Sequence, residues 1–312
     1  MTILILLCTS LLYSQSDNSL EKLSRALSSL ASASDSSTAG TVKPEPANLF
    51  NYAKEGNFEA VKDLVEHGAN VNATDYMGET LIFAAVKGSN PNLEIVKYLV
   101  GKGAIVNAKD NDGWTVLHAA VKGSNPNLKI VKYLVEKGAD PNAKANDGWT
   151  PLFTAVHGPN PKLEIVKYLV EDTNADLKAR TDYDWTVLHA AVQGSNPNLE
   201  IVKYLVEKGA DPNAKNNDGW TVLHAAVKGY NPNLEIVKYL VEKGAKLNAK
   251  DNDGLTPLFA AVHGPNPKLE IVKYLVEDAK ANLNATTKEG STAADLATQQ
   301  EIKEYLERAA KK

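Results

Sequence analysis

The chain has 312 residues, of which 38 are acidic and 34 basic, so its formal net charge at pH 7 is −4. Charges this evenly balanced create no field strong enough to recruit nucleic acid or an anionic membrane surface, which favours protein partners. Because Cys8 is the only cysteine, an intramolecular disulfide and a thiolate metal site are both excluded.

An apolar stretch from Ile3 to Tyr13, followed by polar residues, predicts a secretory signal peptide over residues 1–16. The protein is therefore expected to be secreted or exported. No Lys or Arg precedes the stretch, so a cytoplasmic location is the alternative. The stretch is too short to cross a bilayer, and no stable membrane span is expected.

Residues 17–47 are interpreted as a short amphipathic segment and a flexible linker. Leucines recur at helical spacing at the start of this range: Leu20, Leu23, Leu27 and Leu30. The rest is rich in Ala and Ser and ends with two prolines, so it has too little apolar content to fold.

From residue 48 onward one pattern recurs, Asn-Asp-Gly-Trp-Thr-x-Leu and then Asn-Pro-x-Leu-Glu/Lys-Ile-Val-Lys-Tyr-Leu-Val-Glu. Its four tryptophans lie 35, 36 and 35 residues apart, and Leu255 takes the same place 35 residues later. A unit this short cannot bury its own apolar face, so the units must stack into a solenoid.

Each unit predicts a tip followed by a first helix. The cluster Asp110-Asn111-Asp112-Gly113 is typical of a tight turn, which we expect to form a hairpin tip. Thr115 suits the N-cap of a helix that ends near Lys122, where Gly123 stops it. Sister units place Pro151 or Pro257 directly after the capping threonine, where a helix tolerates proline.

A second helix follows a short turn. We expect the Asn125-Pro126 pair to begin it, with Asn125 as the N-cap and Pro126 in the first helical position. Apolar residues from Leu128 to Val135 give it a broad buried stripe, and Gly138 closes it.

These residues resemble the ankyrin repeat family, whose pattern is Asp-x-x-Gly-x-Thr-Pro-Leu-His, a helix of Leu-Glu-Ile-Val-x-x-Leu-Leu type, and Gly-Ala-Asp-x-Asn-Ala. The resemblance implies an all-α fold, a solenoid of stacked helix-turn-helix units with β-hairpin or loop tips. It covers residues 48–312 as about eight repeats, near 48–74, 75–109, 110–144, 145–180, 181–215, 216–250, 251–286 and 287–312.

Departures from the family pattern fall in turns. Inner repeats exceed the usual length of about 33 residues, and we expect the turn between the helices to hold the additional residues. One further residue, near 172–175 and again near 278–281, is expected in the loop after the second helix. Asp184 replaces the tip glycine, which aspartate tolerates at modest strain.

The resemblance also implies a non-catalytic module that binds a protein partner through its concave face and hairpin tips, as a monomer. The residue before the capping threonine points into that groove in ankyrin repeats, and here it is tryptophan four times: Trp114, Trp149, Trp185 and Trp220. Tryptophan is strongly enriched at binding hot spots. We expect these indoles to form an aromatic strip, although each could instead pack along the neighbouring hairpin.

Two further sets of residues follow from the resemblance. The exposed end of the first helix, which also lines the groove, is occupied by Lys87, Lys122, His157, Gln193, Lys228 and His263. A structural role is expected for the histidines that bond the backbone of the turn: His118, His189 and His224.

No enzymatic motif is found, and no cofactor or metal is expected. Histidines one repeat apart are too distant to share an ion through bonds of about 2 Å. Two other functions stay open: binding of a glycan or small ligand along the tryptophan row, and a structural or toxin-like spacer array.

Overall fold

The structure is a computed structural model that describes residues 48–311. The predicted signal peptide at 1–16 and the predicted segment and linker at 17–47 lie outside these residues.

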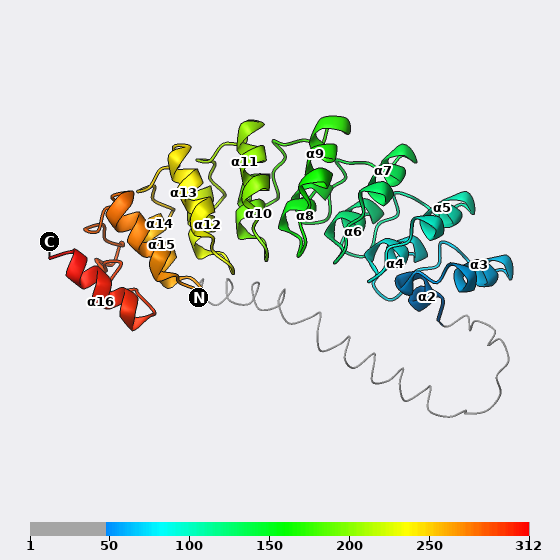
Figure 1. Ribbon diagram of the computed structural model, residues 1–312, viewed down its shortest axis with the longest axis horizontal. Helices are drawn as coiled ribbons and strands as arrows, with labels where there is room; N and C mark the ends of the chain where they lie inside the picture. Colours follow the sequence, from blue (N-terminus) through cyan, green and yellow to red (C-terminus); the bar gives the residue numbers. More distant parts are fainter. Residues whose placement is uncertain (1–47, 312) are drawn as a thin grey trace, which may run out of the picture. The chain divides into compact units, whose positions relative to one another are not determined.

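Helices alternate between two rows (Figure 1). The first helices are α2 (Leu49–Glu55), α4 (Leu81–Lys87), α6 (Val116–Lys122), α8 (Pro151–His157), α10 (Val187–Gln193), α12 (Val222–Lys228) and α14 (Pro257–His263). The second helices are α3 (Phe58–Glu66), α5 (Leu93–Gly101), α7 (Leu128–Glu136), α9 (Leu163–Asp172), α11 (Leu199–Glu207), α13 (Leu234–Glu242) and α15 (Leu269–Lys273), which continues into the π-helical turn η2 (Tyr274–Asp278). The last helix described is α16 (Gln300–Ala309).

The fold is all-α, as predicted. Between residues 48 and 311, β-type pairing is limited to isolated bridges at four tips, for example between Lys109 and Thr115. Each of these four tips therefore has one isolated antiparallel bridge and no strand.

The first helices begin as the sequence predicts. Thr115 is an N-cap with extended backbone, and it forms a capping box with His118. In two sister helices, Pro151 and Pro257 occupy the first position. Proline is compatible with this position because the first helical N–H groups have no partner within the helix.

The prediction for the start of the second helix is wrong. α7 begins at Leu128 and its N-cap is Asn127, whose Oδ1 accepts a hydrogen bond from the N–H of Lys129 at 2.9 Å. Pro126 is buried in the turn before the helix. Because the apolar stripe begins only at Leu128, the nearest residue with an accepting side chain caps the helix, and Asn125 lies outside it.

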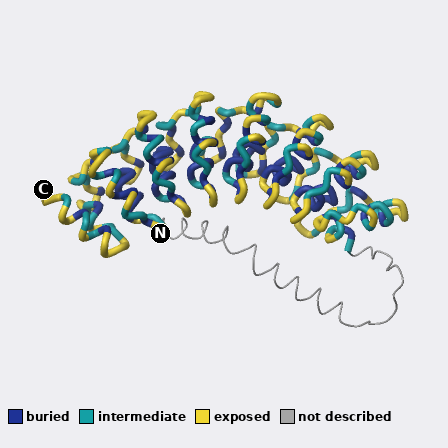
Figure 2. Tube along the Cα trace, viewed as in Figure 1, coloured by how far each residue is buried: buried dark blue, intermediate teal, exposed yellow. Residues whose placement is uncertain are grey.

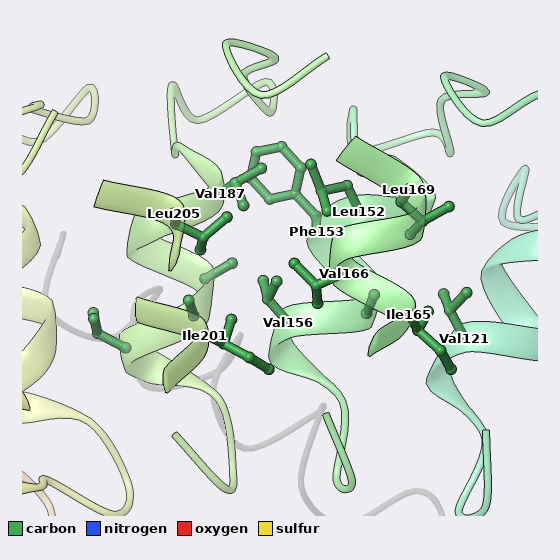
Figure 3. Close-up of a cluster of buried hydrophobic side chains, with 14 of the residues drawn as sticks. Val121, Leu152, Phe153, Val156, Ile165, Val166, Leu169, Val187, Ile201 and Leu205 are labelled. Carbon is green, nitrogen blue, oxygen red and sulfur yellow. The ribbon is translucent and has the colours of Figure 1, made fainter. Parts of the chain in front are cut away.

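Apolar side chains between neighbouring repeats form one continuous core along the stack. Figure 2 shows that buried positions recur all along the stacked helices. In Figure 3, Val156 of α8, Val166 of α9 and Ile201 of α11 gather in the space between two helix pairs, and all three are fully buried. Burial of one such side chain stabilises the fold by roughly 1.5–3 kcal/mol. A helix pair without neighbours would lose this contribution, which explains the stacking.

Hydrogen bonds join each tip to the next. The N–H of Asn146 donates to the carbonyl oxygen of Asp112 at 2.9 Å, and its side-chain amide donates to that of Asn111 at 3.3 Å. Gly113 is required beside this contact. Its φ is +79°, and a Cβ at this position would collide with the Asn146 side chain.

Asp184 takes the left-handed conformation that its glycine sisters take, with φ at +61°. Its Oδ2 lies 2.8 Å from Arg180 Nη1. The sequence prediction of a strained aspartate at this tip is therefore confirmed, and an exposed ion pair accompanies the strain.

The additional residue after the second helix is accommodated in two different ways. After α9, Asn174 takes a left-handed conformation with φ at +54°. After α15, the chain forms the π-helical turn η2 and Lys280 takes the left-handed conformation at +64°. A π-helical turn holds one residue more than an α-helical turn, so the second insertion is partly absorbed within the helix.

Candidate functional site

The tip holds the backbone of the tryptophan that follows it. The N–H of Asp110 donates to the carbonyl oxygen of Trp114 at 3.0 Å, and Asp110 Oδ1 accepts from the N–H of Trp114 at 2.8 Å. Asn216 does the same for Trp220, at 3.0 and 2.8 Å. These bonds fix the backbone of the tryptophan, from which the indole extends, relative to the first helix.

Each indole lies over the first helix of its own repeat. The ring centroids of Trp114 and His118 are 5.4 Å apart, and Lys122 Nζ lies 4.5 Å from the indole centroid. Trp149 meets His157 edge-on, with 5.0 Å between centroids. All four tryptophans are half-buried, so part of each ring faces solvent.

We call this surface the wall. It consists of one row of residues that precede the capping threonine and a second row eight positions later: Trp114, Trp149, Trp185, Trp220 and Leu255, with Lys122, His157, Gln193, Lys228 and His263. The structure thus pairs members of the two sets that the sequence predicted separately. Among these pairs, Lys228 Nζ lies 4.4 Å from the indole centroid of Trp220.

Glu79 precedes the wall in the repeat at 75–109, at the place of the tryptophans. It is only 5% exposed, and its Oε1 lies 2.8 Å from Lys87 Nζ. Lys87 is therefore part of an ion pair. Lys87 was predicted from the sequence, whereas Glu79 was not, although alignment of the repeats places Glu79 in the tryptophan position.

The histidines His118, His189 and His224 are buried. The N–H of Thr115 donates to His118 Nδ1 at 3.1 Å, so that nitrogen is an acceptor. His118 Nε2 therefore carries the proton and donates to the carbonyl oxygen of Trp149 at 3.0 Å. His189 and His224 make the same bond to Trp220 and Leu255, at 3.2 and 3.0 Å.

Burial lowers the pKa of four histidines in or beside the first helices. It lowers the pKa of His118 and of His189 to about 4 against the ordinary 6.5, and it also lowers the pKa of His224. On the wall, burial and the charge of Lys122 lower the pKa of His157 to about 4. The pKa of Lys228 is lowered overall, because the effect of burial exceeds the opposing effect of the negative charge of Asp251.

The tips of two repeats carry exposed aromatic residues that the sequence analysis missed. Tyr76 is 88% exposed and Tyr183 is 64% exposed. Both stand in tip positions that most other repeats fill with Asn or Asp, and this replacement was the signal available in the sequence. The tips therefore add apolar surface beside the wall.

The described residues contain no cluster of potential metal ligands. Within 48–311, no group of three or more His, Cys, Asp or Glu residues is arranged to bind an ion. The same range contains no helix of the length and apolar character needed to cross a membrane.

Comparisons with known proteins agree with this architecture. A search of curated proteins finds no match. The family model described as "Ankyrin repeats (3 copies)" matches residues 49–145, 124–216, 195–287 and 223–310. Ankyrin repeats generally serve as protein–protein interaction modules, and proteins built from them are typically non-catalytic scaffolds. With matches that run through nearly all of the stacked helix pairs, the chain belongs to the ankyrin repeat family.

Proposed function

We propose that this ankyrin repeat protein is a non-catalytic, monomeric module that binds a protein partner through the wall and the adjacent hairpin tips. The observation that carries the proposal is the repetition of a half-buried indole at one place in four consecutive repeats: Trp114, Trp149, Trp185 and Trp220. Each ring contacts its own first helix, so binding orders few side chains. Large, pre-ordered tryptophans are the side chains that most often dominate binding energy.

Lysine side chains that cover two of the indole rings favour a protein partner over a glycan. Lys122 lies over the ring of Trp114 and Lys228 over that of Trp220. A sugar stacking on those faces would have to displace the ammonium groups. A hollow in the wall at Leu255 has a volume of about 30 Å³, whereas pockets for small ligands usually hold roughly 300–1,000 Å³.

We also propose that the protein is exported, on the basis of the signal-like residues 1–16. Sequencing the N-terminus of the mature protein, together with cell fractionation, tests this proposal. A mature protein that begins at Met1 and stays in the cytoplasm would contradict it.

The binding proposal is tested by cross-linking followed by affinity measurement. A photo-reactive residue in place of Gln193 should cross-link the partner, which mass spectrometry then identifies. The matched variant replaces all four tryptophans with leucine, a change that we expect the fold to tolerate because Leu255 stands in the same place. We expect its affinity for the partner to fall by about a hundredfold or more.

The control is Ile105→Asp, which removes an exposed apolar side chain from a loop and copies Asp140 of the next repeat. Its affinity should equal that of the wild type. If the four-leucine variant folds and binds equally well, the wall is not the binding surface. If that variant loses stability and no partner depends on the wall, the spacer function is favoured.

A further inference from the structure

The wall contains a hollow at Leu255, next to the last tryptophan of the row. The hollow has a volume of about 30 Å³, and its lining includes Trp220, Phe259 and Leu296. It exists because leucine is smaller than the residue in the sister repeat. There, Trp149 contacts Phe153 and His157 with ring centroids 5.8 and 5.0 Å apart.

The size and lining of the hollow define what fits. One water needs roughly 10–15 Å³ by the same kind of measure, so the hollow admits two or three water-sized groups. Phe259, Leu255, Leu296 and the indole of Trp220 present carbon atoms to it. A branched aliphatic side chain, such as that of valine or leucine, matches both properties.

A positive charge lies at the edge of the same hollow. Lys228 belongs to its lining and is half-buried over the indole of Trp220. None of the ion pairs formed within residues 48–311 includes Lys228.

Asp251, the acidic residue in the lining, forms no ion pair with Lys228, although its negative charge acts on that ammonium group from a distance. Its Oδ1 accepts the backbone N–H groups of Asp253 and Leu255, at 2.9 and 2.8 Å. The Lys228 ammonium group is half-buried and has lost part of its hydration, so a carboxylate placed against it on the side away from Asp251 would form a charge-assisted hydrogen bond.

We infer that the wall at Leu255 is a specificity subsite for an extended peptide segment of the partner, which places a branched aliphatic side chain in the hollow and an adjacent carboxylate on Lys228. The inference rests on the proposed function, because it assigns the chemistry of the partner at one point of the wall.

Two substitutions in the full-length chain test the apolar hollow and the Lys228 charge separately. Leu255→Trp fills the hollow with the side chain that Trp149 presents in the sister repeat. Lys228→Met removes the charge and keeps an apolar stem over the indole. Both variants should unfold in urea at the wild-type midpoint.

The probe is a phage-displayed library of random linear peptides, selected on the wild-type chain. We expect the enriched peptides to share Val, Leu or Ile beside Asp or Glu, and to bind Leu255→Trp at least about tenfold more weakly. Replacing the acidic residue of a selected peptide with its amide should weaken wild-type binding about tenfold and should leave binding to Lys228→Met unchanged. Leu255→Ala, which enlarges the hollow, should shift selection toward larger apolar residues.

Three results would overturn the subsite: no selected peptide responds to Leu255→Trp, selected peptides lack the shared pair of residues, or Leu255→Ala leaves the selection unchanged. If peptides insensitive to Leu255→Trp still depend on the other tryptophans, the subsite fails and the proposed function stands. If no wall variant changes the binding of any selected peptide, the subsite and the proposed function fail together.

Discussion

His118 Nε2 donates a hydrogen bond to the carbonyl oxygen of Trp149 at 3.0 Å. Trp149 is the tryptophan that the following repeat contributes to the wall. The other ring nitrogen of His118 accepts the N–H of Thr115, so one imidazole joins the cap of its own helix to the next repeat. The bond recurs between His189 and Trp220. The side chains that hold the stack together therefore also position the wall.

Replacing His118 with alanine should lower the free energy of unfolding by about 2–3 kcal/mol. The change leaves the N–H of Thr115 and the carbonyl oxygen of Trp149 without their partner, and it opens a cavity in the stack. Urea unfolding followed by circular dichroism measures the loss. The exposed His263, replaced in the same way, is the control and should change stability by less than about 0.5 kcal/mol. Equal losses for the two variants would show that the imidazole of His118 does not join the repeats.

Stability should fall as the pH drops from about 6.5 toward 4. The pKa of His118 and of His189 in the folded chain is about 4, below the ordinary 6.5, so in this interval the unfolded chain binds more protons. The contribution of each histidine is complete above the ordinary value and is lost as the pH approaches the folded value, by roughly 2 kcal/mol at pH 5.

Urea unfolding at pH 7 and pH 5 tests this dependence. The difference between the two conditions should be smaller in His118→Ala than in the wild type, because one of the titrating groups is gone. Identical differences would mean that His118 does not titrate as its burial requires.

Gly113→Ala should destabilise the protein more than Gly138→Ala. Both glycines have positive φ, +79° and +90°, so each alanine adds backbone strain of about 1–2 kcal/mol. Only at Gly113 does the new Cβ collide with a neighbouring tip, whereas nothing lies within 4 Å of it at Gly138. The two unfolding free energies in urea measure the contact between tips, and equal values would contradict the role given to it.

The repeating helices could be predicted from the sequence because local signals agree with the packing. Thr115 and Pro151 mark helix starts, and the apolar spacing marks the buried faces. The start of α7 was misplaced because Asn125-Pro126 is a valid helix signal by itself. Only the packing shows that the apolar face begins at Leu128, which leaves Asn127 to cap the helix.

The residue types of the wall could also be predicted, but their contacts could not. The pairing of Trp114 with Lys122 depends on how the indole lies over its helix, and the pattern does not specify that orientation. The hollow at Leu255 depends on Leu296, which is contributed by the next repeat. Glu79 was overlooked because its charge hides its equivalence to the tryptophans, although it pairs with Lys87 across the same helix.

The binding surface is tested most simply by the affinity of the Trp185→Leu variant for the partner that cross-linking identifies. Calorimetric titration measures this affinity and that of the wild type. Trp185 has tryptophans on both sides in the row, and leucine already occupies the equivalent place at 255. We predict that the affinity falls by at least about tenfold, or roughly 1.4 kcal/mol, and that the unfolding curve is unchanged. An affinity within about twofold of the wild type, for a variant that is folded, would contradict the claim that the tryptophan row binds the partner.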